Sequence, residues 1–215
     1  MDNIVNALAL KSADYKENDK MVTLFTADYG KVTAIMRGVK KKGAKLKFAT
    51  QVFNYGEYEF ATIGNTNIVT GCNQLESFFK ITKDVESFYA ASVATELLLN
   101  LSVTEKDSKD YFSETLKFFT LLKCDGVNNR TLLGKYLYNI AQLEGYAVTD
   151  ISILSQNTLP VAVIELFDMF RFNTYIEIAQ IRDEYAPQKV MLKLFYNFYV
   201  QHIIEVKALE QMIKL

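Results

Sequence analysis

A cluster of positive side chains is the strongest chemical signal in this sequence. Between Arg37 and Lys47 the chain carries six cations and no carboxylate, although its net charge is only −1. A local group of cations on a nearly neutral chain indicates a localised anionic partner. If all six contacted phosphates of single-stranded nucleic acid, the slope of log affinity against log salt would be roughly −4.

Two further basic residues lie on the strands expected beside this loop. Together with the six cations of the loop, they are candidates for binding DNA phosphates. The alternative interpretation is a solvated lysine loop without a ligand. The candidates are Lys20, Lys31, Arg37, Lys40, Lys41, Lys42, Lys45 and Lys47.

Aromatic residues near the basic loop could stack on bases, which is worth about 1–3 kcal/mol per base. The competing interpretation places them in the core of the domain, and the core is favoured for any single one of them. These residues are Phe25, Tyr29, Phe48, Phe53, Tyr55 and Tyr58.

Catalysis and metal binding find little support in the sequence. Glu57 and Glu59 project to the same side of an expected strand, but nothing there would separate two pKa values as an acid–base pair requires. His202, Cys72 and Cys124 are too few for a four-ligand zinc site. No GxGxxG, GxxxxGK[ST], HExxH or GxSxG motif occurs. We therefore expect a binding protein with no cofactor, and not an enzyme.

Five short strands are expected to position the cations. The short turn containing Gly30 joins two of them as a hairpin, and Gly56 and Gly71 within strand patterns indicate bends typical of a small closed barrel. Five strands in about 75 residues fit an OB-fold barrel. The expected strands span 4–10, 20–26, 31–37, 50–62 and 67–75.

From about residue 83 the hydrophobic period changes from two to 3.6, which predicts helices. The fold class is therefore α+β, with an OB-fold domain at 1–80 followed by an all-helical domain at 81–215. Expected helices span 83–102, 108–123, 129–144, 160–170 and 188–213.

Arg130 and Lys135 lie beside apolar residues of the expected third helix. They could form the cationic edge of a groove that takes an acidic peptide. The alternative is the ordinary surface of an amphipathic helix.

The composition favours a cytoplasmic protein. Only two cysteines occur, far apart in the sequence, which is typical of a reducing compartment. The sequence has no run of about 18 apolar residues and no pattern of a secretory signal, so no membrane association is expected.

The assembled motifs resemble those of the RecO family of bacterial recombination mediators. The resemblance is carried by AxxLKSxDYxEND (7–19), VTLFTxDYGKVxAIxRGxKK (22–41), QVF (51–53), GCNQLESFFKITKD (71–84) and FYNFYVQHIIEVKALEQM (195–212). It covers most of the chain and is most specific in the first 85 residues.

This resemblance implies an N-terminal OB-fold and a helical domain that follows it. It implies binding of single- and double-stranded DNA, annealing of complementary strands and action with RecR. Together with RecR, such a protein would help to load RecA onto DNA coated by single-strand-binding protein, whose acidic C-terminal tail it would bind. A nucleoid-associated location follows from these functions.

The sequence departs from the RecO pattern in one respect. Many RecO proteins carry four cysteines that form a zinc module after a Gly-Tyr pair like Gly145-Tyr146, whereas residues 147–190 of this chain contain no cysteine. We expect a reduced, zinc-free insert at about 146–186. Apolar packing would hold it, through Ile151, Ile153, Leu154, Leu166 and Phe170.

A second function remains open at the level of the sequence. The chain could be an adaptor that binds RecR and acidic tails and has little affinity for DNA.

Overall fold

The computed structural model describes residues 4–181 and 185–215. The chain forms two compact units. The first contains the residues up to Phe79 together with Ser102–Ser113, and the second contains Lys80–Leu101 and Glu114–Leu215.

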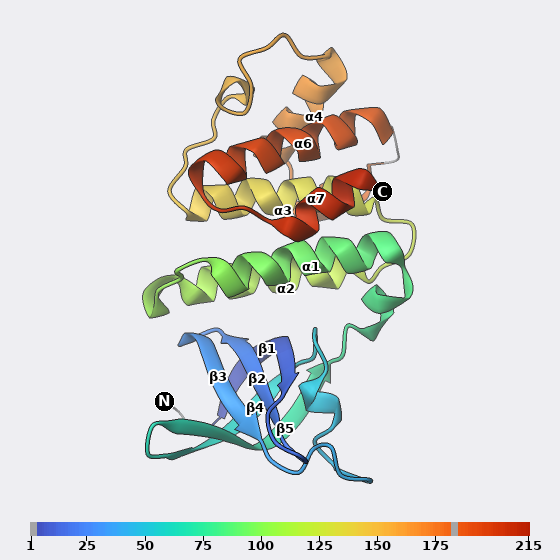
Figure 1. Ribbon diagram of the computed structural model, residues 1–215. Helices are drawn as coiled ribbons and strands as arrows, with labels where there is room; N and C mark the ends of the chain where they lie inside the picture. Colours follow the sequence, from blue (N-terminus) through green and yellow to red (C-terminus); the bar gives the residue numbers. More distant parts are fainter. Residues whose placement is uncertain (1–3, 182–184) are drawn as a thin grey trace. The chain divides into compact units, whose positions relative to one another are not determined.

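Five strands of the first unit form a closed barrel with the strand order β1-β2-β3-β5-β4 (Figure 1). β3 and β5 pair in parallel and the other neighbours pair antiparallel. This closed five-stranded arrangement confirms the predicted OB-fold. The strands are β1 (Ile4–Asp14), β2 (Lys20–Thr26), β3 (Gly30–Met36), β4 (Tyr55–Ile63) and β5 (Thr66–Glu76).

A bulge in β1 decides which side chains face the inside of the barrel. Ala9 pairs with Leu24 and Lys11 pairs with Thr23, so Leu10 is the additional residue. Because side chains alternate between faces, one inserted residue reverses the alternation that follows it. Ser12 consequently lies opposite the core residue Val22 and faces inward.

The fourth strand begins later than the predicted residue 50. A 3-10 helix, η1 (Phe48–Thr50), precedes it, and Phe53 adopts a left-handed conformation with φ of 70°. The Phe53 N–H donates to the Ala9 carbonyl, and the Ala9 N–H donates to the Asn54 carbonyl. These hydrogen bonds hold residues 53–54 against β1 before the regular pairing of β4 begins. The alternation of apolar and polar residues in the sequence does not reveal such bonds.

The residues Ser102–Ser113 pack on the outside of the barrel. The Phe112 ring stacks on Phe25 with centroids 6.5 Å apart and meets the Tyr55 ring edge-on at 5.9 Å. The Ser108 hydroxyl donates to the Ala27 carbonyl. An aromatic cluster thus covers one outer face of the barrel. Phe112 contributes to this cluster from the first part of helix α2 (Glu105–Leu122).

The second unit is helical (Figure 1). In it, α1 packs against α3 and α7, and α6 packs against α3, α4 and α7. Besides part of α2, its elements are η2 (Phe79–Lys83), α1 (Val85–Asn100), α3 (Asn129–Leu143), η3 (Ile151–Ile153), α4 (Val161–Phe172), α5 (Tyr175–Ala179), α6 (Tyr185–His202) and α7 (Lys207–Lys214).

The prediction of one last helix over 188–213 is wrong, because α6 ends at His202 and α7 begins at Lys207. The intervening sequence, Ile-Ile-Glu-Val, is rich in β-branched residues, which favour helices less. The Glu96 carboxylate of α1 then accepts hydrogen bonds from the N–H groups of Lys207 and Ala208. A distant side chain therefore caps α7, and a sequence pattern cannot show this.

Helix α5 was not anticipated, although a local signal for it exists. The Thr174 side chain and Glu177 form a reciprocal capping box at its start. A threonine followed three residues later by glutamate is a known sign of a helix start.

Apolar packing holds the described part of the expected insert only in part. Leu154, Leu166 and Phe170 are buried, whereas Ile153 is exposed. The Phe170 ring lies directly on Gly134 of α3, where a Cβ would come within 2.5 Å of the ring. Gly134 therefore permits the close approach of Phe170 to α3.

Within the described residues, no helix is both long enough and apolar enough to cross a membrane.

Candidate nucleic-acid interface at the mouth of the barrel

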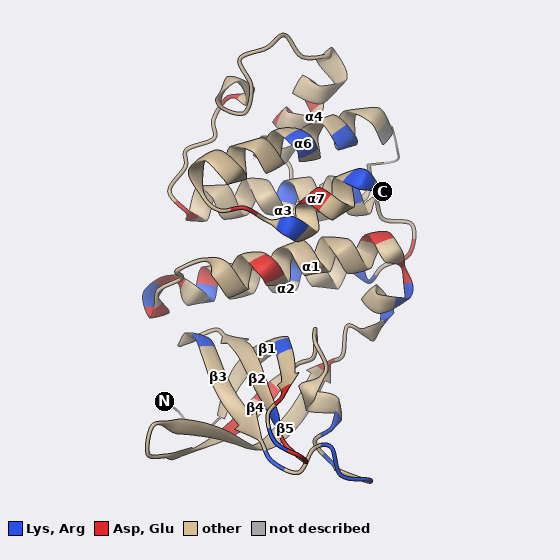
Figure 2. Ribbon diagram, in the orientation of Figure 1, with Lys and Arg blue, Asp and Glu red and all other residues tan. Residues whose placement is uncertain are grey.

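The basic loop, defined as residues 37–47, follows β3 and folds as a series of tight turns. The N–H of Lys41 donates to Gly38 O, that of Ala44 to Lys41 O, and that of Lys47 to Ala44 O. Gly38 and Gly43 have φ of 67° and 76°, a conformation that suits glycine. The turns keep the cations close together at one end of the barrel, as the blue loop after β3 in Figure 2 shows.

The turn between β1 and β2 holds the start of this loop. The Asp19 carboxylate accepts from the Gly38 N–H at 2.9 Å, and the Asn18 carbonyl accepts from the Lys40 N–H at 3.0 Å. The Lys40 ammonium also lies 2.8 Å from the Asp14 carboxylate. This hydrogen bond with Lys40 is the main cause that lowers the pKa of Asp14.

The barrel core anchors the far end of the loop. Ala49, just beyond it, is fully buried, and its carbonyl accepts a hydrogen bond of 2.9 Å from the Tyr58 hydroxyl. The Asn54 amide donates in turn to the Tyr58 oxygen at 2.8 Å. Burial raises the pKa of Tyr58 and raises that of the neighbouring Cys72 thiol to about 11, so both stay protonated near neutral pH.

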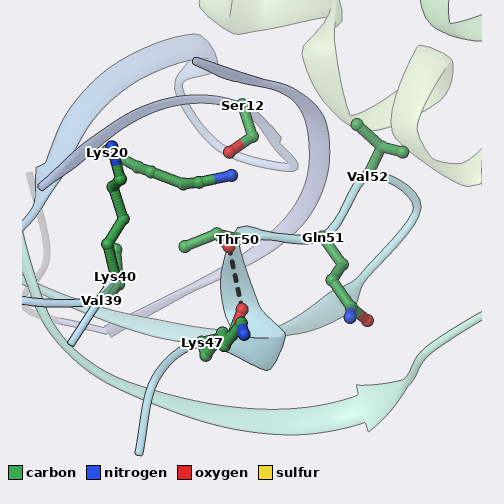
Figure 3. A pocket seen from close by; sticks show the side chains of 8 residues that line it. All are labelled: Ser12, Lys20, Val39, Lys40, Lys47, Thr50, Gln51 and Val52. Atoms are coloured by element: carbon green, nitrogen blue, oxygen red, sulfur yellow. Dashed lines mark hydrogen bonds between the residues drawn. The ribbon is translucent and has the colours of Figure 1, made fainter. Parts of the chain in front are cut away.

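A pocket of about 560 Å³ opens between the loop and the barrel (Figure 3). Ser12 and Lys20 face it from β1 and β2 at positions that continue the inward-facing side of the barrel, so the pocket is the mouth of the barrel. Its lining residues are Ser12, Lys20, Val39, Lys40, Lys47, Thr50, Gln51 and Val52.

The structure thus brings three candidate cations, Lys20, Lys40 and Lys47, to one pocket. The other loop cations, with Arg37, are exposed at the same end of the barrel. Lys31 lies at the start of β3, whereas Arg37 directly follows the end of that strand, so Lys31 belongs to the opposite end of the barrel.

The aromatic residues mainly build the core. Phe25, Phe53 and Tyr58 are buried, and Tyr29 and Phe48 pack against the barrel core. Tyr55 packs against Phe112. The geometry therefore favours contacts with the nucleic-acid backbone over stacking on bases by these six side chains.

Arg130 and Lys135 are not at the edge of a groove, where the sequence had placed them. Arg130 is 3% exposed, and its guanidinium binds the Glu86 carboxylate at 2.8 Å and the Met212 carbonyl at 3.4 Å. Lys135 is 8% exposed and donates to the Phe170 carbonyl. Burial lowers the pKa of Lys135, an effect that Glu114 partly opposes. Helical periodicity could not distinguish these inward positions, because lysine and arginine are rarely buried.

Ser12 and Asp14 are the residues of this site that the sequence analysis missed. The only local signal is their spacing of two on β1, which places them on one face, but the bulge at Leu10 decides that this face is the inner one. Among the described residues, the Ser12 hydroxyl oxygen is buried and has no hydrogen-bond partner.

Residues 1–78, which contain the barrel and its basic loop, match the family model described as "Recombination protein O N terminal". The first 78 residues are therefore similar to the N-terminal domain of RecO proteins. The match covers the OB-fold and the whole mouth of the barrel.

Curated relatives show the same similarity. The chain is 33% identical over 140 residues to the DNA repair protein RecO of Clostridium novyi, covering 65% of this chain and 55% of that protein. It is 29% identical over 155 residues to the protein of the same name from Clostridium perfringens, covering 71% and 63%. For the RecO of Shouchella clausii, the identity is 36% over 102 residues, covering 47% and 40%. The chain thus spans about half the length of the curated RecO proteins that it matches.

Proposed function

We propose that this chain is a DNA-repair protein that binds single- and double-stranded DNA through the basic end of its barrel. The observation that carries the proposal is the gathering of Lys20, Arg37 and the loop lysines around one mouth of an OB-fold. The Asp19 bond, the Tyr58 bond and the successive turns hold this loop to the barrel. A positive surface held in place binds polyanions without having to order itself first.

The chemistry of the proposed function is charge screening. Two DNA strands repel each other through their phosphates, and cations placed between them reduce that repulsion. Complementary strands could then approach and pair. We therefore propose that the chain anneals complementary strands by binding and does not break bonds.

Similarity to RecO proteins supports the wider proposal of a recombination mediator. In it, the chain acts with RecR to load RecA onto DNA coated by single-strand-binding protein, and it would contact the acidic tail of that protein through residues other than Arg130 and Lys135. The alternative of an adaptor without DNA affinity loses support, because its predicted cations Arg130 and Lys135 are buried and already bonded.

An annealing assay with a charge-reversal variant tests the proposal. In the variant, three exposed loop lysines become glutamate: Lys41→Glu, Lys42→Glu and Lys45→Glu. We expect annealing of complementary oligonucleotides to slow by at least about tenfold, since three favourable phosphate contacts become repulsive.

The matched control reverses three exposed lysines elsewhere, Lys106→Glu, Lys109→Glu and Lys193→Glu, and thus changes the net charge equally. It should anneal nearly as fast as the wild type. Equal annealing by the loop variant and the wild type would refute the proposed interface.

A further inference from the structure

The pocket at the mouth of the barrel ends on packed core. Val39, which lines it, is 3% exposed, and Val22 and Leu24, which follow the lining residue Lys20 along the inner face of β2, are fully buried. A polynucleotide therefore cannot thread through the barrel. Only a terminal or projecting group can enter from the mouth.

The charges that surround the pocket suit a doubly charged anion. Three lysines line the pocket, Lys20, Lys40 and Lys47, and each carries one positive charge. Asp14 lies opposite Lys20 across β1 and β2 and is bonded to Lys40, so it contributes one carboxylate. Three ammonium groups against one carboxylate leave two positive charges. A phosphate monoester carries about −1.5 to −2 at pH 7, whereas an internal phosphodiester carries a single charge.

The pocket also offers a neutral donor. The Ser12 hydroxyl lines it, is shielded from solvent and has no hydrogen-bond partner among the described residues. A buried polar group without a partner is costly, so an acceptor brought by a ligand would be stabilised there. In Figure 3 the Lys20 side chain extends from β2 across the pocket.

We propose that this pocket binds a phosphate monoester, and that its ligand is the terminal phosphate of a DNA strand. The inference rests on the proposed function, since the loop cations would hold the rest of the strand. The volume of the pocket, about 560 Å³, lies within the range of roughly 300–1,000 Å³ that is usual for small-ligand sites, so a terminal nucleotide fits. Ser12 would donate to a phosphate oxygen, and Lys20 and Lys47 would neutralise its charge.

Asp14 has a defined part in this arrangement. Its carboxylate accepts from Lys40 as a phosphate would, so it competes with the ligand for that ammonium. Asp14→Asn should therefore strengthen binding of the phosphorylated end. Asp28→Asn, an exposed position in the turn at the opposite end of β2, is the matched control.

The test compares internally labelled single-stranded oligonucleotides of one sequence that end in a 5′-phosphate, a 3′-phosphate or only hydroxyl groups. Fluorescence anisotropy with the full chain should show about tenfold tighter binding of one phosphorylated form. Ser12→Ala and Lys20→Ala should bring this ratio toward one. Lys31→Ala, at the other end of the barrel, should leave the ratio unchanged.

Competition identifies the source of the monoester. If inorganic phosphate or a deoxynucleoside monophosphate removes the preference at millimolar concentration, the isolated group suffices; if only phosphorylated oligonucleotides do so, the strand end is the ligand. Equal affinity for phosphorylated and unphosphorylated strands would overturn the inference and leave the proposed function intact. No binding of any oligonucleotide at low salt would instead overturn the proposed function.

Discussion

At the scale of single residues, the role of a charged side chain depends on whether it is exposed or buried against a partner. The loop lysines are exposed and available to a ligand. Arg130 has the same charge, but it is buried between α1, α3 and the end of α7 and bonded to Glu86. Its role is therefore to join three helices of the second unit.

This arrangement predicts an asymmetry between the two partners of the ion pair. Arg130 is 3% exposed in its side chain, while Glu86 is 40% exposed. Glu86→Ala leaves a buried guanidinium without its carboxylate and should lower the free energy of unfolding by about 3 kcal/mol. Arg130→Met leaves a glutamate that water can solvate, so it should cost less. Urea unfolding of both variants measures the difference.

The double variant completes the cycle and should be about as stable as Arg130→Met alone. An equal loss in the two single variants would contradict the view that the buried guanidinium depends on Glu86.

At the scale of elements, the basic loop depends on the strand beneath it. The Tyr58 hydroxyl of β4 reaches the Ala49 carbonyl just after the loop and accepts from Asn54. The basic loop could be predicted from the sequence. Its attachment to β4 could not, because a tyrosine in a strand pattern does not reveal which carbonyl its hydroxyl meets.

Tyr58→Phe tests the attachment. The variant leaves the ring but removes the hydroxyl, so the buried Ala49 carbonyl and Asn54 amide each lose a partner. We expect a loss of about 1–3 kcal/mol in the stability of the barrel, measured by hydrogen exchange of its strand amides. DNA affinity should fall with it, because the basic loop loses its support.

Tyr15→Phe is the control for this change, since Tyr15 is 44% exposed. It should leave both stability and affinity near those of the wild type. Unchanged exchange in Tyr58→Phe would show that the hydroxyl does not hold the loop.

At the scale of the whole molecule, the hydrophobic pattern correctly predicted five strands followed by helices. The change of hydrophobic period near residue 83 separates strands from helices, and Gly30 marks the turn between β2 and β3. Three features could not be predicted from the sequence: the packing of Ser102–Ser113 on the barrel, the capping of α7 by Glu96 and the inward direction of Ser12. Each of them depends on pairing or contacts with another part of the chain.

The whole barrel is proposed to act as one electrostatic surface, on which the cations at the mouth hold nucleic acid through its phosphates. We expect base stacking to contribute little, because the aromatic residues near the loop are buried or packed against other residues. Affinity should therefore depend strongly on salt and weakly on base sequence.

The most direct test is a salt titration of binding to a single-stranded oligonucleotide with hydroxyl ends. For the wild type, log affinity against log salt should have a slope of roughly −4, and the variant with Lys41, Lys42 and Lys45 changed to glutamate should lose about two units of that slope. A slope near zero in the wild type, or an unchanged slope in the variant, would contradict the claim.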